Sequence, residues 1–87
     1  MNWDDIRIFL AVARAGQILG AARRLGLNHA TVARRLTALE TELRAQLLTR
    51  RPSGTELTRA GEEFLLAAER MEAEMLGARA AVGDASV

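Results

Sequence analysis

Apolar residues recur at intervals of three and four along most of the chain, which is the spacing of helices that bury one face. The first such stripe consists of Ile6, Phe9, Leu10 and Ala13. Asn2 precedes it as a candidate N-cap, and Gly16 follows it as a candidate stop. The pattern predicts a helix over about residues 3–15.

Two further helices are predicted with very little chain between them. The second covers about residues 17–25 and ends at Gly26, which can adopt the left-handed conformation of a helix C-terminus. The third covers about residues 28–44, with Asn28 as its N-cap and with apolar positions at Val32, Leu36, Leu39 and Leu43. Two short helices joined by so tight a turn must cross steeply, which predicts a helix-turn-helix.

After the third helix the pattern changes to one typical of β-strands. Residues 47–50 and 55–58 flank a turn that has Pro in second and Gly in fourth position. The sequence therefore predicts a two-stranded hairpin over residues 47–58, here called the wing. Two adjacent arginines, Arg50 and Arg51, lie at its tip.

A long helix is predicted from the N-cap Thr58 to about residue 82. Its apolar residues alternate in steps of four and three, which is typical of a coiled-coil seam. The seam consists of Phe64, Ala68, Met71, Met75, Ala78 and Val82. Because the helix is longer than so small a domain can cover, we expect its C-terminal half to pair with a second copy, and packing of the seam on the domain's own core is the alternative. Residues 83–87 are expected to form a flexible tail.

The net charge of +1 conceals a strong asymmetry along the 87 residues. All 12 basic residues are Arg, and residues 7–59 carry ten of them against three Glu. Residues 60–87 carry two Arg against six acidic side chains. A cationic segment beside an acidic one points to a polyanionic partner for the cationic part. Arg also suits bidentate contacts with phosphate or guanine.

Composition excludes several classes of protein. The chain has no Cys, which rules out a disulfide framework and a thiolate metal site. Its apolar runs are far shorter than the roughly 20 residues that span a bilayer, and no signal peptide is apparent. We expect one small cytoplasmic domain with a mainly α-helical fold.

The chain lacks the residues that a catalytic site would need. His29 is the only histidine, and the chain has too few Ser and Asp to complete a catalytic triad or a metal site around it. We therefore expect no enzymatic activity and no cofactor. Next to a helix N-cap, His29 is instead expected to contact DNA in the groove, with an exposed polar residue as the alternative.

Several motifs follow one another in a consistent order over about residues 2–82. They are Phe9-Leu10-Ala11-Val12-Ala13, Ala21-Ala22-Arg23-Arg24-Leu25-Gly26, Leu39-Glu40 and Leu57-Thr58-Arg59-Ala60-Gly61, with Gly16, Val32, Arg34, Leu43, Leu47 and Arg50 between them. In these residues the chain resembles the N-terminal DNA-binding domain of LysR-type bacterial transcription regulators. The chain departs from the family's usual pattern at residues 28–33, which enter the third helix, and at Arg44, where the family commonly has Gly.

The resemblance implies a winged helix-turn-helix over residues 1–58 and a linker helix over residues 59–82 through which two subunits dimerise, with a tetramer as a further option for a full-length protein. It also implies a larger effector-binding domain that binds a small-molecule inducer. Because the chain ends before such a domain, we expect it to be an excised DNA-binding fragment.

We therefore expect sequence-specific binding to double-stranded DNA, with the third helix in the major groove and the wing at the minor groove or backbone. The residues expected at the DNA are Arg23, Asn28, His29, Ala30, Thr31, Ala33, Arg34, Arg35, Arg50, Arg51 and Ser53. Arg34 is expected to reach a base edge or a phosphate, and Arg35 a phosphate.

Two choices stay open at this point. One of Arg23 and Arg24 is expected to approach the DNA backbone while the other pairs with an acid, and the wing arginines could instead be solvated charges paired with Glu56. The alternative function is a helical module that binds a protein partner through the seam of the long helix.

Overall fold

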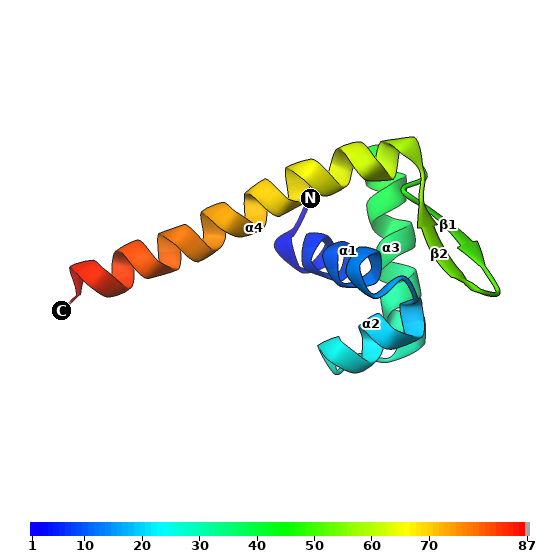
Figure 1. Ribbon diagram of the computed structural model, residues 1–87, viewed down its shortest axis with the longest axis horizontal. Coiled ribbons are helices and arrows are strands. Elements are labelled where there is room, and N and C mark those ends of the chain that lie inside the picture. The colour runs from blue at the N-terminus through cyan, green and yellow to red at the C-terminus, as the bar shows by residue number, and fades with distance from the viewer. Residues whose placement is uncertain (87) are drawn as a thin grey trace.

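A computed structural model describes residues 1–86 and has the architecture of a winged helix-turn-helix with a long C-terminal helix (Figure 1). Its elements are α1 (Trp3–Ala15), α2 (Ile18–Leu25), α3 (His29–Leu43), β1 (Leu48–Arg51), β2 (Gly54–Leu57) and α4 (Arg59–Ala85). The mainly helical fold and the order of elements predicted from the sequence are confirmed. Within the described residues, none of the helices has the length and apolar composition needed to cross a membrane.

Local side-chain caps explain where α1 and α3 begin. The Asn2 side chain accepts a hydrogen bond from the backbone N–H of Asp5 (3.1 Å), and the Asn28 side chain accepts one from that of Ala30 (2.8 Å). Between α2 and α3 the chain turns at Gly26, whose φ of 66° is rarely adopted by residues with a Cβ. The N–H of Leu27 donates to the carbonyl of Ala22 (2.9 Å) and closes this turn.

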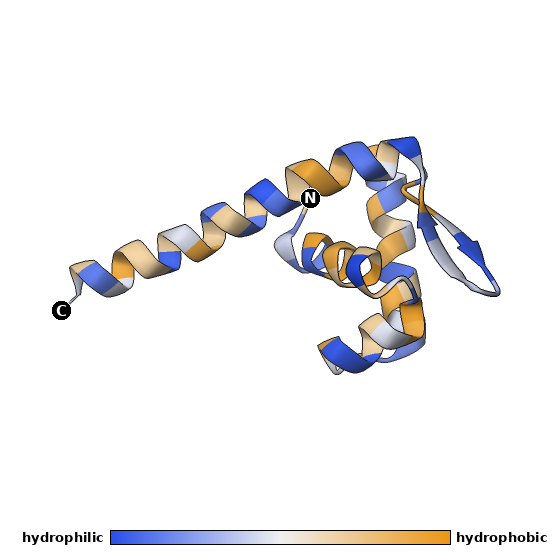
Figure 2. Cartoon of the chain, in the orientation of Figure 1, coloured by the Kyte–Doolittle hydropathy of each residue, from blue (hydrophilic) through white to orange (hydrophobic). Residues whose placement is uncertain are grey.

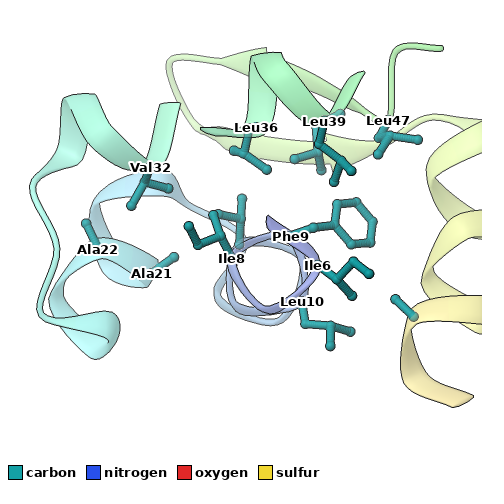
Figure 3. Close-up of a cluster of buried hydrophobic side chains, with 13 residues drawn as sticks. Ile6, Ile8, Phe9, Leu10, Ala21, Ala22, Val32, Leu36, Leu39 and Leu47 are labelled. Atoms are coloured by element: carbon teal, nitrogen blue, oxygen red, sulfur yellow. The ribbon is translucent and has the colours of Figure 1, made fainter. Parts of the chain in front are cut away.

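Helix α1 lies at the centre of the hydrophobic core (Figure 3). Phe9 and Val12 have no exposed surface, and α1 contacts α2, α3, α4 and β2. The ring of Phe9 meets the ring of Phe64 on α4 edge to face, with centroids 5.1 Å apart. The buried side chains of Ala21 and Ala22 are short, which lets α2 pack closely in the core.

The wing forms an antiparallel hairpin in which Leu48 pairs with Leu57 and Arg51 with Gly54. Each strand is shifted by one residue toward the turn from the prediction, and the N–H of Leu47, just before β1, donates to Glu40. Gly54 has a φ of 141°, and a Cβ there would lie 2.6 Å from the carbonyl oxygen of Gly16. The wing is therefore held against the corner between α1 and α2.

Helix α4 begins as predicted, where Thr58 accepts a hydrogen bond from the N–H of Gly61 (3.0 Å). It ends at Ala85 rather than at residue 82, so the predicted tail is helical over its first three residues, and Val87 lies outside the described residues. About half of α4 projects away from the rest of the molecule (Figure 1).

The seam of α4 divides into two parts with different surroundings. Phe64 and Met71 pack against the core, and Ala68 is 0% exposed. Ala68 therefore has no surface left for a second copy, contrary to its place in the predicted pairing seam. Farther along the same face, Met75 and Val82 are exposed. The changeover lies at Glu72, beyond which every described residue of α4 is exposed.

An ion pair fastens α4 to α1 at this changeover. The two terminal nitrogens of Arg14 donate to the two carboxylate oxygens of Glu72, at 2.7 and 3.0 Å. This hydrogen-bonded guanidinium lowers the pKa of Glu72 below its ordinary value, and the same contact raises the pKa of Arg14. The pair is therefore fully charged at neutral pH.

Helix α3 ends at Arg44, which is the one residue other than glycine with a positive φ (54°) in the described chain. Its backbone N–H donates to the carbonyls of Glu40 and Thr41, as at an ordinary helix C-terminus. Arg44 nevertheless carries a Cβ, so its left-handed backbone conformation is strained.

We predict that Arg44→Gly raises the free energy of unfolding by roughly 1 kcal/mol, because glycine adopts this conformation without strain. Arg44→Ala removes the same charge but keeps the strain, and we expect it to stay within about 0.5 kcal/mol of the parent. Urea unfolding followed by circular dichroism at one protein concentration measures both. Equal stability of the two variants would contradict the strain at Arg44.

Candidate nucleic-acid interface

The outward face of α3 is the centre of the candidate interface. Val32, Leu36 and Leu39 are buried, which fixes the rotation of α3 about its own axis. The opposite face is therefore presented to solvent. Arg34 lies on this outward face, is exposed, and forms no ion pair with any described residue. A guanidinium without an intramolecular partner, on an exposed helix, can hydrogen-bond to a base edge or a phosphate.

The first turn of α3 surrounds Arg34 with small or polar residues. The side-chain oxygen of Asn28 accepts the capping hydrogen bond. His29 and Ala30 are exposed, and Thr31 and Ala33 are half-buried. Small side chains at these positions allow another molecule to approach the helix backbone closely. The structure thus brings together five of the predicted α3 residues around Arg34.

Arg35 has a different environment from Arg34. Its Nη1 donates to the carboxylate of Asp5 on α1 at a distance of 3.0 Å, in a partly buried ion pair. The sequence predicted a phosphate contact for Arg35, but the structure gives this side chain a partner within the chain. Arg35 therefore joins the third helix to the first, and we do not include it among the DNA-contacting residues.

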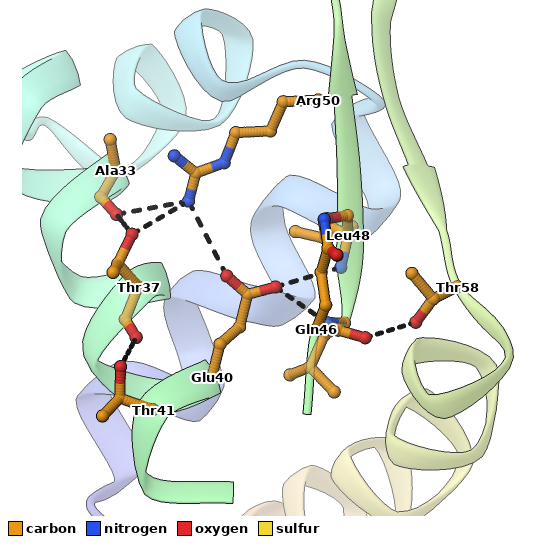
Figure 4. Close-up of polar contacts among 9 residues, drawn as sticks. Ala33, Thr37, Glu40, Thr41, Gln46, Leu48, Arg50 and Thr58 are labelled. Carbon is orange, nitrogen blue, oxygen red and sulfur yellow. Dashed lines mark hydrogen bonds and ion pairs between the residues drawn. The ribbon is translucent and has the colours of Figure 1, made fainter. Parts of the chain in front are cut away.

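Arg50 folds back from the wing onto α3 instead of extending from the hairpin tip (Figure 4). Its Nη2 lies 3.4 Å from the carbonyl oxygen of Ala33, 3.3 Å from Oγ1 of Thr37 and 4.0 Å from the Glu40 carboxylate. The guanidinium is consequently placed at the edge of α3, between this helix and β1.

Glu40 is the residue at this site that sequence reasoning did not single out. Its Oε2 accepts hydrogen bonds from the backbone N–H groups of Leu47 (2.7 Å) and Leu48 (3.3 Å). The other carboxylate oxygen faces Arg50. One carboxylate on α3 thus fixes the start of the wing and orients its first arginine. In the sequence, Glu40 appeared only within the Leu39-Glu40 motif. A polar residue in a helix gives no local sign of a hydrogen bond to a backbone N–H seven residues away.

Arg51 lies at the tip of the wing beside the exposed turn residue Ser53. Its Nε is 3.6 Å from the carboxylate of Glu56 on β2, and both side chains are more than half exposed. Ion pairs of this kind contribute little free energy in water. Arg51 can therefore exchange Glu56 for another anion at small cost.

A cleft of about 300 Å³ separates the wing from the helix-turn-helix. Arg50, Arg51 and His29 line it together with the start of α2, where Gln17 and Ile18 lie. Helix α2 has no side-chain hydrogen bond at its N-cap and no acidic residue in its first turn. The positive end of the α2 dipole and the wing arginines therefore converge on this cleft, which favours an anion.

Arg23 and Arg24 lie in the last turn of α2, and both are exposed. Figure 2 shows hydrophilic residues gathered at this end of α2 and on the wing. Neither arginine forms an ion pair within residues 1–86, so the prediction that one of them pairs with an acid is wrong for the described chain. Over the same residues, no cluster of acidic or histidine side chains could hold a metal ion.

Comparison with known proteins agrees with this arrangement. The family model described as "Bacterial regulatory helix-turn-helix protein, lysR family" matches residues 3–62. The chain is 37% identical over 95 aligned residues to the HTH-type transcriptional regulator TcbR of Pseudomonas sp. strain P51, with 100% of this chain and 32% of TcbR covered. It is 42% identical over 71 residues to ClcR of Pseudomonas putida, which covers 82% of this chain and 24% of ClcR. The chain thus spans about a third or less of the length of these relatives.

Among solved structures, a CbnR DBD–DNA complex superimposes with a TM-score of 0.88 at 37% identity, and the match covers 99% of this chain and 98% of that one. The full-length CbnR complex with its target DNA gives a TM-score of 0.83 at 38% identity and covers 28% of CbnR. These relatives are described as transcriptional regulators. The chain therefore belongs to the LysR family of bacterial regulatory helix-turn-helix proteins, and it is a DNA-binding domain of that family.

Proposed function

We propose that this chain binds double-stranded DNA sequence-specifically as a homodimer, with α3 in the major groove and the wing at the minor groove or backbone. The observation that carries the proposal is the outward face of α3. Arg34 stands there exposed and without an intramolecular partner, while its neighbour Arg35 is held by Asp5. An α-helix fits the width of the major groove, and Arg is the side chain that most often reads guanine there.

The cleft between α2 and the wing is proposed to receive a phosphate of the DNA backbone. It combines the uncapped N-terminus of α2 with Arg51 and His29, so backbone N–H groups, the Arg51 guanidinium and the His29 ring can act on one anion. At the other end of α2, Arg23 and Arg24 are available for a second phosphate. Contacts on both sides of α3 would fix the register of the helix in the groove.

Arg50 and Arg51 are proposed to contact different parts of the DNA. Arg51 at the tip can enter a minor groove, where the negative potential attracts arginine. Arg50 is already held at the edge of α3 by Ala33 and Thr37, so it is proposed to contact the phosphates that border the major groove.

The homodimer is proposed to form through the exposed half of α4. Met75, Ala78 and Val82 continue the face that Phe64 and Ala68 turn toward α1, and Val82 is 69% exposed. An apolar helix face that extends past its own domain is stabilised when a second helix covers it. Pairing of two such dimers, and control by a small-molecule inducer, are proposed only for a full-length regulator. DNA binding implies a cytoplasmic location in a bacterial cell.

We expect Arg34→Ala to weaken binding to a duplex selected from a random pool by roughly 1–3 kcal/mol, because one base or phosphate contact is lost. Arg70→Ala on α4 is the matched control, since Arg70 is also exposed and forms no ion pair within the described chain. Fluorescence anisotropy measures both. Equal affinities of the two variants would contradict the placement of Arg34 at the DNA.

Replacing Met75 by Glu should raise the dimer dissociation constant at least tenfold, because it places charge in the pairing face. Leu66→Glu is the control: Leu66 is 58% exposed and lies nine residues earlier, on the opposite side of α4. Sedimentation velocity over a concentration series gives the dissociation constants. The proposed dimer is wrong if Met75→Glu associates as strongly as Leu66→Glu.

A further inference from the structure

Helix α4 is held by the rest of the domain over only its first half. Phe64 stacks edge to face on Phe9, and Ala68 is completely buried one turn later. Beyond Glu72 the helix continues for 13 residues to Ala85 without a buried side chain. The direction of this projecting segment, residues 73–85, is therefore decided by whatever holds α4 just before it begins.

The last contact before the projecting segment is the ion pair between Arg14 and Glu72. It joins the final turn of α1 to α4 across 58 residues of sequence through two parallel hydrogen bonds of 2.7 and 3.0 Å. Side-chain packing at Phe64 and Ala68 resists separation of the two helices but opposes their rotation weakly, because apolar contacts are non-directional. A bidentate pair between two planar groups is directional and restrains that rotation.

We propose that the Arg14–Glu72 pair sets the angle at which α4 leaves the winged helix-turn-helix, and thereby the separation of the two DNA-binding heads in the dimer. Arg14 and Glu72 are positioning residues in this account, since neither lies at the candidate DNA interface. The statement about head separation rests on the proposed dimer, whereas the statement about the angle concerns a single chain.

Because the projecting segment is long, a small rotation of α4 displaces its far end by several ångströms. From Ala68 to Ala85 the helix is about 25 Å long, so a rotation of about 10° about Ala68 moves its end by about 4 Å. One base-pair step of DNA is about 3.4 Å, so a change of this size corresponds to a shift of one base pair in half-site spacing. The shift is larger when both subunits contribute.

The same pair is not expected to decide whether the domain folds. The Arg14 and Glu72 side chains are 45% and 30% exposed, and exposed ion pairs add little to stability. The buried contacts of Phe9, Phe64 and Ala68 stay intact when either charge is removed. Variants at Arg14 and Glu72 should therefore fold and differ from the parent in geometry.

The angle can be measured within one chain by the distance between two spin labels. The chain has no native Cys, so Arg24→Cys on α2 and Gly77→Cys on α4 give two unique sites. Both sites suit labelling, because Arg24 is exposed and a Cβ at Gly77 meets no atom within 4 Å. Doubly labelled protein is diluted with unlabelled protein, so that distances between subunits do not contribute.

We expect Arg14→Gln and Glu72→Gln each to broaden this distance distribution at least twofold, and the exchanged pair Arg14→Glu with Glu72→Arg to restore it. Arg7→Gln is the control, because it removes an ion pair that lies within α1, to Asp4. An unchanged width in both single variants, or equal broadening in Arg7→Gln, would overturn the proposal.

A second measurement addresses head separation. Duplexes from the random-pool selection are lengthened by one and two base pairs between the half-sites, and we expect the parent to lose at least tenfold in affinity and Arg14→Gln less than threefold. A spacing preference that Arg14→Gln leaves unchanged would overturn the proposed role in head separation. A parent without any spacing preference would instead contradict the proposed dimer, and the single-chain distances would still decide the angle.

Discussion

The burial of the apolar side chains of α1 is the constraint on which the other elements depend. Phe9 and Val12 have no exposed surface, so α1 must be covered by other elements on several sides. The helix-turn-helix covers one side and α4 covers another, through the contact between Phe64 and Phe9. Because α3 packs inward through Val32, Leu36 and Leu39, its opposite face with Arg34 is presented to solvent, where we propose that it meets DNA. Burial of apolar surface thus orients the helix that we propose to bind DNA.

Polar contacts add the precision that apolar packing lacks. Glu40 on α3 binds the start of the wing and faces Arg50, so one carboxylate joins the wing to α3. Arg35 and Arg14 form ion pairs within the chain, with Asp5 and Glu72 respectively. Some arginines therefore hold the elements together while others have no buried partner, and the net charge alone does not separate the two groups.

Local features of the sequence were sufficient to predict the elements and their order. Asn2, Asn28 and Thr58 cap their helices as predicted, since a cap acts within three residues. The errors concern contacts between distant residues. Nothing near Arg35 in the sequence indicates that Asp5 binds it, and the spacing of the α4 seam does not reveal that Ala68 meets its own core. Periodicity identifies a buried face, but not the partner that buries it.

The central claim is that the arginines left without buried partners form a surface for duplex DNA. Its most direct test is the affinity for a duplex of about 20 base pairs as a function of salt. With Arg50, Arg51 and at least one arginine of α2 each neutralising a phosphate, log K should fall against log salt with a slope of about −3 or steeper per chain. Absence of binding at low salt, or a slope near zero, would contradict the account.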